Sequence, residues 1–256
     1  MSALTLDINC DCGESFGNWS LGNDSAVMPL VTSANIACGF HASDPVTMLR
    51  TVDLALTNGV RIGAHPGLPD LLGFGRRMMN ITAEDCYAYV VYQVGALAAA
   101  VRTRRSRLYH VKPHGCLMAM VGSDRALADA FVAAVADTCD EPTVYFTAPL
   151  SGAELPLAAA RRGVRVVAEV YPDLAYDDKG KVVIQRHKAA ALPDDCAKQI
   201  RRFIEHGHVE TLSGRTLALD AQSICVHGDG PNALDILRAI RVQIVNSGAA
   251  VVTRAA

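Results

Sequence analysis

Residues 7–17 read DINCDCGESFG, and this stretch shapes both the fold and the site. Side chains alternate between the two faces of a strand, so Asp7, Asn9 and Asp11 share one face and the apolar residues between them share the other. The apolar face would pack against helices, which turns the polar face towards the inside of a barrel. Buried carboxylates are costly unless cations, hydrogen bonds or a metal ion accompany them. The stretch therefore predicts a first strand whose polar face belongs to a functional site or, for Asp7, to a structural hydrogen-bond network.

Two further dense stretches, NIACGFHASDP at 35–45 and HVKPHG at 110–115, also lie where a strand is expected to end. Chemistry in parallel α/β folds gathers at the ends of the strands, where the loops begin. The expected strands are Leu4–Asn9, Ala34–Ala37, Val60–Ala64, Leu108–Lys112, Thr143–Phe146, Val164–Glu169 and Ser223–His227. Helical patterns separate them, and this alternation predicts a parallel sheet.

Helix starts support this reading. Asp44 precedes Pro45 as a helix cap, Thr82 and Asp85 form a capping box, and Pro231 opens a last helix. Seven strand–helix units without a low-complexity linker favour a single barrel over residues 1–256, with an open doubly wound sheet as the alternative. The segment 171–193 lacks helical periodicity. Its first part, YPDLAYDDKGKVV at 171–183, predicts a hairpin that turns at 177–180 and extends over the barrel mouth.

Composition excludes several classes of function. Half of the 256 residues are apolar, a fifth are charged and the net charge is −2, which argues against nucleic acid as a partner. The eight cysteines show no CxxC spacing and predict reduced thiols. The first residues do not resemble a signal peptide, and the apolar run Val90–Val101 is too short to cross a membrane. We therefore expect a cytoplasmic protein with no membrane partner.

Histidines follow or close four of the expected strands. They are His41, His65, His114 and His227. A single histidine is more often a packed core residue, but repetition at strand ends favours a site. Asp229 follows His227 by two residues, and a histidine oriented by a carboxylate can act as a general acid or base near neutral pH.

Charged side chains accompany these histidines. Lys112 alternates onto the same face as His110 and His114, and a lysine facing carboxylates can neutralise substrate charge or stabilise an oxyanion. Glu14 follows the first strand and Glu169 closes the sixth. These residues extend the predicted site around the barrel.

The loop GFGRR presents Arg76 and Arg77, which could bind a substrate carboxylate or phosphate, or could simply be surface arginines. No GxxxxGK[ST] phosphate loop and no GxSxG nucleophile motif occurs in the sequence. The stretch GDGPNA at 228–233 is not followed by a strand with an acidic end, so we discount a dinucleotide site.

Five stretches resemble the LamB/YcsF family in order along the chain. They are DINCDCGESFGNW, MPLVTSANIACGFHASDP, GVRIGAHPGLPDLLGFGRR, HVKPHG and ICVHGDGP. The resemblance covers residues 7–231, nearly the whole chain. It implies an irregular (β/α)7 TIM-like barrel similar to the glycoside hydrolase and deacetylase barrels.

The resemblance also implies an activity. Family members form the A subunit of the prokaryotic 5-oxoprolinase, which opens the lactam of 5-oxoproline to L-glutamate with ATP hydrolysis to ADP and phosphate. It implies Mg-ATP as cofactor and 5-oxoprolinase subunits B and C as partners, with activity only in their presence. From residue type and placement we assign catalytic roles to Asp11, Glu14, His41, Lys112, His227 and Asp229. We assign substrate binding to Asp7, Asn9, His65, Arg76, Arg77, His114 and Glu169.

Two alternatives stay open. Asp11, His41 and His65 could form the metal site of an independent amidase or deacetylase, although no HExxH motif is present. A non-catalytic binding paralogue is the other alternative. It rests on Met118, Ala119 and Leu174, where the family usually has tyrosine, asparagine and arginine. These differences bear on the substrate more than on the class of reaction.

Overall fold

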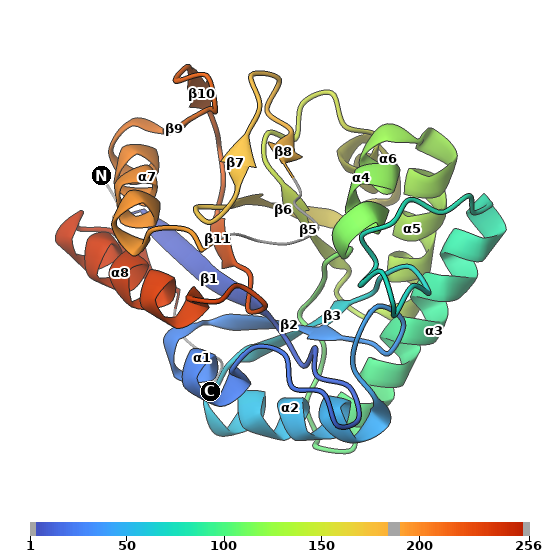
Figure 1. The fold of residues 1–256 in the computed structure, drawn as a ribbon. Helices are drawn as coiled ribbons and strands as arrows, with labels where there is room; N and C mark the ends of the chain where they lie inside the picture. The colour runs from blue at the N-terminus through green and yellow to red at the C-terminus, as the bar shows by residue number, and fades with distance from the viewer. Residues whose placement is uncertain (1–3, 184–189, 253–256) are drawn as a thin grey trace.

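A computed structural model describes residues 4–183 and 190–252 and shows parallel strands ringed by helices (Figure 1). The barrel strands are β1 (Thr5–Cys12), β2 (Ser33–Ala37), β3 (Arg61–His65), β4 (His110–Val111), β5 (Thr143–Thr147), β6 (Arg165–Val170) and β11 (Ser223–Val226). They pair in parallel in the order β11, β6, β5, β4, β3, β2, β1, and β11 also pairs with β1. This pairing closes the ring, so the predicted seven-stranded (β/α) barrel is confirmed and the open sheet is wrong.

Helices cover the outside of the barrel. They are α1 (Asp24–Val27), α2 (Pro45–Thr57), α3 (Ala83–Arg102), α4 (Gly115–Ser123), α5 (Arg125–Thr138), α6 (Glu154–Arg162), α7 (Pro193–His206) and α8 (Ala233–Asn246), with a 3-10 turn η1 (Met28–Leu30) after α1. Strand β12 (Ala250–Val251) pairs with the first residues of β1. Among the residues described, no helix is both long enough and apolar enough to cross a membrane.

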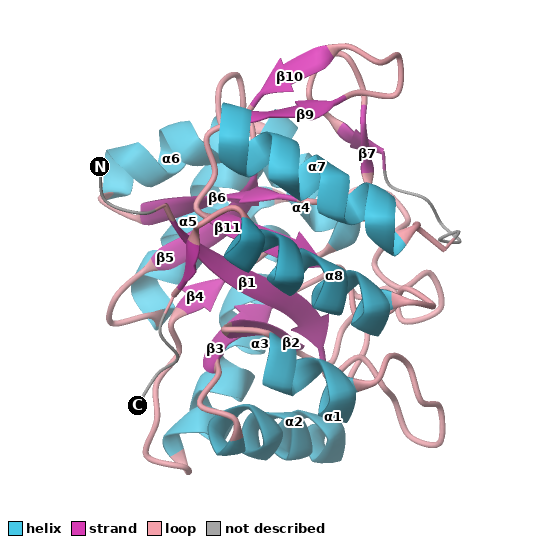
Figure 2. Ribbon diagram, turned by 90° about the vertical axis from the view of Figure 1, so that its left-hand side faces the viewer, coloured by secondary structure: helices cyan, strands magenta, loops and turns pink. Residues whose placement is uncertain are grey.

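Two antiparallel hairpins stand outside the barrel. One consists of β7 (Ala175–Tyr176) and β8 (Val182–Val183), and the other of β9 (His208–Glu210) and β10 (Thr216–Ala218). Figure 2 shows β9 and β10 beyond α7 at one end of the molecule. The first hairpin confirms the prediction for 171–183, and residues 184–189 lie outside the described part. Helix α7 and the second hairpin were not among the expected elements.

Strand β1 is longer than predicted because it pairs on both sides. Its middle residues pair with β11, and residues up to Cys12 pair with β2 as far as Ile36. Strand β4 is shorter than predicted. Pro113 follows closely and has no N–H with which to extend the ladder.

Local signals at the helix starts are confirmed. The Asp44 side chain accepts from the N–H groups of Val46 and Thr47 at the start of α2. Thr82 and Asp85 form the predicted capping box of α3. Helix α8 begins at Ala233, two residues after the predicted start at Pro231.

The faces of β1 follow the prediction. Leu6, Ile8 and Cys10 are fully buried on the side of the helices. The alternating polar residues turn inwards, where they meet polar groups from the other strands. The inside of the barrel is thus polar, and the main hydrophobic core lies between strands and helices. All eight cysteines are free thiols, as predicted.

We expect opposite effects from two glycine substitutions. A methyl group at Gly63 in β3 would collide with the His110 ring inside the barrel, whereas one at Gly95 in α3 would meet nothing within 4 Å. Gly63→Ala should lower the free energy of unfolding by about 1–3 kcal/mol because the packed interior cannot yield. Gly95→Ala should raise it by about 0.8–1.0 kcal/mol through helix propensity. Urea unfolding measures both, and equal effects would contradict the packing of His110.

Candidate active site

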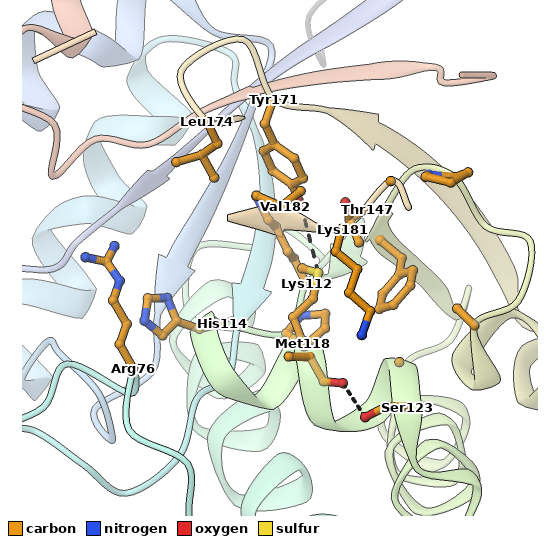
Figure 3. A pocket seen from close by; sticks show the side chains of 18 of the residues that line it. Arg76, Lys112, His114, Met118, Ser123, Thr147, Tyr171, Leu174, Lys181 and Val182 are labelled. Carbon is orange, nitrogen blue, oxygen red and sulfur yellow. Dashed lines mark hydrogen bonds between the residues drawn. The ribbon is translucent and has the colours of Figure 1, made fainter. Parts of the chain in front are cut away.

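A cavity of about 390 Å³ opens at the carboxyl ends of the barrel strands. Five residues that end or follow strands form its floor: Asp11, His65, Lys112, His114 and His227. Its walls come from α4 and from the β7–β8 hairpin, which contributes Lys181 and Val182. Figure 3 shows Arg76 and His114 on one side of this pocket and Thr147 and Lys181 on the other. The hairpin thus extends over the mouth, as its sequence predicted.

Asp11 is at the centre of the floor. Its Oδ1 accepts from Asn35 Nδ2 at 2.8 Å and from Lys112 Nζ at 3.3 Å. Its Oδ2 lies 3.5 Å from His65 Nε2 and 3.9 Å from His227 Nε2. Burial opposes ionisation, but the charges of His65 and Lys112 outweigh it and hold the pKa of Asp11 well below its usual value. Asp11 is therefore a carboxylate at neutral pH, with a hydrogen-bond acceptor facing two imidazoles.

Lys112 is the buried cation of the site. Its Nζ lies 3.3 Å from Glu169 Oε2 and 2.8 Å from Cys225 Sγ, besides its contact with Asp11. Burial alone would lower the pKa of Lys112, but the charges around it, that of Asp11 first, raise the pKa well above its usual value. The lysine is therefore charged, and it balances the carboxylates inside the barrel.

The carboxylate that orients His227 is Asp173. The distance from His227 Nδ1 to Asp173 Oδ2 is 3.0 Å, and Asp173 also accepts from the backbone N–H of His227. The predicted partner Asp229 is wrong for this role, because it accepts from Arg76 Nη2 at 2.7 Å. Asp173 follows β6, directly before Leu174, the residue that the sequence comparison singled out in this segment. Its own role was missed, although a carboxylate so near a strand end was a usable signal.

Four predicted residues gather beside Asp11. Glu14, His41, His65 and His114 are buried and each brings one potential ligand atom within 4.8 Å of the others. His114 Nδ1 lies 3.0 Å from His65 Nε2, and His41 stacks on His114 with ring centroids 3.7 Å apart. Burial lowers the pKa values of His41 and His114 well below the usual value, so both rings are neutral at pH 7. Of these four, His65 and His114 line the pocket.

Three predicted substrate-binding residues lie deeper in the barrel and do not line the pocket. Asp7 accepts from the hydroxyl groups of Thr32, Ser33 and Ser223, each at 2.7 Å. Asn9 donates to Glu169 Oε1 at 2.6 Å. For Asp7 this arrangement fits the structural hydrogen-bond network that the sequence analysis gave as one of two possibilities. Glu169 contacts the site indirectly, through its ion pair with Lys112.

The two arginines of GFGRR separate. Arg76 lines the pocket, where it bonds Asp229 and stacks over Phe74 with 4.8 Å between the guanidinium carbon and the ring centroid. Arg77 pairs with Asp70, and its side chain is 53% exposed outside the pocket. Sequence reasoning assigned no role to Tyr171, whose hydroxyl donates to Glu169 Oε2 at 2.8 Å at the pocket wall.

We expect burial of His110 to make the stability of the fold sensitive to acid. Burial and then the charge of Lys112 lower the pKa of His110 to about 3. The unfolded chain binds this proton below pH 6.5 and the folded chain does not, so stability falls as pH falls from 6.5 towards 3, by up to about 1.4 kcal/mol per unit. His110→Gln, which can still donate to Asn35, should flatten the slope by that amount. Urea unfolding between pH 7 and 4 tests this, and identical slopes would contradict it.

A closed (β/α) barrel with a carboxylate, a lysine and histidines at the ends of its strands is the arrangement of a barrel enzyme, and this places the protein in that class. The sequence profile of the LamB/YcsF family matches residues 6–256. The chain belongs to the LamB/YcsF family.

Similar proteins of known name and similar solved structures are consistent with membership of this family. The chain is 46% identical over 248 residues to the 5-oxoprolinase A subunit of Bordetella parapertussis, covering 96% of this chain and 97% of that one. It is 44% identical over 245 residues to the 5-oxoprolinase A subunit of Tolumonas auensis, covering 95% and 96%. A lactam utilization protein of Thermus thermophilus superposes with a TM-score of 0.87 at 39% identity, covering 96% and 98%. A family 4 carbohydrate esterase of Streptomyces lividans, at 12% identity and a TM-score of 0.50, covers 98% and 93% and shares the fold alone.

Proposed function

We propose that this chain is the lactam-opening A subunit of an ATP-dependent 5-oxoprolinase. Relatives at about 45% identity over nearly the whole length carry that name, and the similar solved structure is a lactam utilization protein. The observation that carries the proposal is the placement of Asp11 at the pocket floor between Lys112, His65 and His227. That group combines an acid–base pair with a fixed positive charge, which amide cleavage requires.

The reaction has two demands that this group can meet. A lactam carbonyl is a poor electrophile, and transfer of the γ-phosphoryl group of ATP to its oxygen, with release of ADP, activates it. Water then adds to the carbonyl carbon, the C–N bond breaks as the ring nitrogen takes a proton, and a second water releases phosphate from the acyl phosphate. The Asp173–His227 pair is suited to carry protons in these steps, and Lys112 to stabilise developing negative charge.

The pocket walls suit a small anionic ligand. Arg76, Lys179 and Lys181 bring positive charge, and Met118 and Leu174 add apolar surface. A carboxylate and a phosphate both carry negative charge, so we propose that these cations face the substrate carboxylate and the transferred phosphoryl group. We also propose that Mg-ATP is the phosphoryl donor and that subunits B and C take part in supplying it, as the naming of the relatives as one subunit of an enzyme supports.

The test is glutamate release from 5-oxoproline with Mg-ATP, using this chain alone and then together with subunits B and C from the same genome. We expect glutamate only in the complete mixture, with ADP formed alongside it. No glutamate from a mixture in which the three subunits demonstrably assemble would overturn the proposal. Amide cleavage by the chain alone without ATP would instead favour the metal-dependent amidase. Ligand-induced thermal stabilisation without product would favour the non-catalytic paralogue.

A further inference from the structure

When both rings are neutral, two histidines beside the pocket face each other through nitrogens that carry no hydrogen. The Nδ1 of His65 lies 2.8 Å from the backbone carbonyl oxygen of Lys112, and the Nε2 of His114 lies 2.8 Å from that of Phe74. A carbonyl oxygen only accepts, so each of these nitrogens must donate. A neutral imidazole has a single N–H, which leaves the other nitrogen of each ring with a bare lone pair. These two bare nitrogens are 3.0 Å apart.

Two lone pairs at that distance repel unless a cation lies between them. The cation can be a proton, which would make one ring an imidazolium, or a metal ion held by both rings. A backbone carbonyl that fixes the far nitrogen of a histidine is the usual way in which proteins orient metal-binding imidazoles. Both rings of the pair have this support: His65 is the last residue of β3, and His114 follows the adjacent strand β4 at the start of α4.

The neighbouring residues decide between proton and metal. A proton would satisfy the pair but would do nothing for His41, which is fully buried and whose two ring nitrogens have no hydrogen-bond partner within the described chain. His41 Nε2 lies 3.6 Å from Glu14 Oε1, which exceeds hydrogen-bond length. A buried polar ring without a partner is costly, and coordination to a metal ion would remove that cost.

The spacings fit a compact metal site. At a Zn–N distance of about 2.0–2.1 Å, a tetrahedral site separates its donor atoms by roughly 3.3–3.4 Å. Two separations between donor atoms of the group, 3.0 Å for His65–His114 and 3.6 Å for His41–Glu14, bracket this value. The rings of His41 and His114 are parallel within 3°, so the lone pairs of His41 do not point at an ion held by His114. The His41 ring must therefore turn on binding, and no hydrogen bond from residues 4–183 or 190–252 to its ring nitrogens opposes the turn.

We propose that Glu14, His41, His65 and His114 bind one divalent transition-metal ion of the zinc type. Three imidazoles and a carboxylate suit zinc, cobalt and nickel better than magnesium or calcium, which prefer oxygen ligands. Because His65 and His114 line the pocket, the ion would lie at the pocket wall, where it could polarise a bound carbonyl or activate water. The proposal does not depend on which amide is the substrate.

The metal content of the purified chain tests the proposal without any activity assay. Protein stripped with a chelator should take up one equivalent of Zn²⁺ in competition with a chromophoric chelator, and Co²⁺ should give the intense visible bands of a tetrahedral site. Glu14→Gln and His114→Gln should each weaken Zn²⁺ binding at least about 10-fold, as loss of a ligand or of its support does. Far-UV circular dichroism checks that the variants are folded. If His114→Gln does not fold, the zinc affinity of Glu14→Gln alone provides the test.

A control addresses binding at the surface. His206 and His208 are stacked on the outside, with ring centroids 5.6 Å apart, and could bind zinc adventitiously. A variant with His206→Gln and His208→Gln should keep the single tight equivalent and the cobalt spectrum. Loss of the tight equivalent in this control would overturn the proposal. So would a folded wild-type chain that takes up no metal, which would leave a shared proton between His65 and His114.

Discussion

Replacing Asp11 with Asn is expected to lower the rate of ATP-dependent glutamate formation by about 10²–10⁴-fold while the barrel stays folded. The substitution keeps the shape of the side chain and can keep the contact with Asn35. It removes the negative charge that faces His65 and His227 and that pairs with Lys112. Initial rates in the complete three-subunit mixture measure the effect, and circular dichroism reports the fold.

A matched substitution outside the pocket separates a direct effect on the reaction from an effect on folding or stability. Asp44 is also a carboxylate that accepts from backbone N–H groups, but it caps α2 and does not line the pocket. Asparagine is as good a helix cap as aspartate, but its amide nitrogen cannot accept from the Gly17 N–H as Oδ2 of Asp44 does. Asp44→Asn should therefore preserve the rate and lower the stability slightly. If Asp11→Asn kept a rate within tenfold of that of Asp44→Asn, Asp11 would not be part of the chemistry.

The second large effect is expected for Lys112→Met. Removing this cation leaves Asp11 and Glu169 buried without the charge that both contact at 3.3 Å. Breaking a buried ion pair on one side costs about 3–5 kcal/mol of unfolding free energy. Glutamate formation should fall to background, because the proposed stabilisation of negative charge is lost as well. Urea unfolding and the same rate assay measure the two effects.

Two companion variants make this result interpretable. Combining Lys112→Met with Glu169→Gln removes one of the two stranded carboxylates, so the double variant should regain part of the stability but no activity. Lys198→Met removes an exposed lysine that pairs with Asp195 on α7 and should change neither property measurably. A Lys112→Met protein as stable as the wild type would contradict a charged, paired lysine at this position.

Most of the barrel was predictable because its signals are local. The alternation of polar and apolar residues in β1 fixes which face turns inwards, and the caps at Asp44 and Thr82 mark helix starts whatever the tertiary structure. Strand ends were less predictable because pairing with neighbours sets them. Helix α7 and the β9–β10 hairpin follow the irregular segment in which no periodic pattern was recognised.

The site was predictable in composition but not in pairing. Residues at strand ends, such as Asp11, Lys112 and His227, converge because all strands of a parallel barrel end on the same side. Which carboxylate orients His227 depends on how the loops fold back, and residues near in sequence gave the wrong partner in Asp229. Asp173 meets His227 from 54 positions away, a distance that no local pattern encodes.

Closure of the barrel between β1 and β11 has a consequence for how the chain folds. Asp7 pairs with Ser223, which lies 216 positions later in the sequence. Contacts this far apart give a high contact order and slow folding, because the entropy of closing the long loop is lost before the contact forms. On the ribosome, β1 must remain without its closing neighbour until nearly the whole chain has been synthesised. Nascent chains should therefore expose an unpaired strand edge for most of translation, and this edge is open to aggregation until β11 emerges.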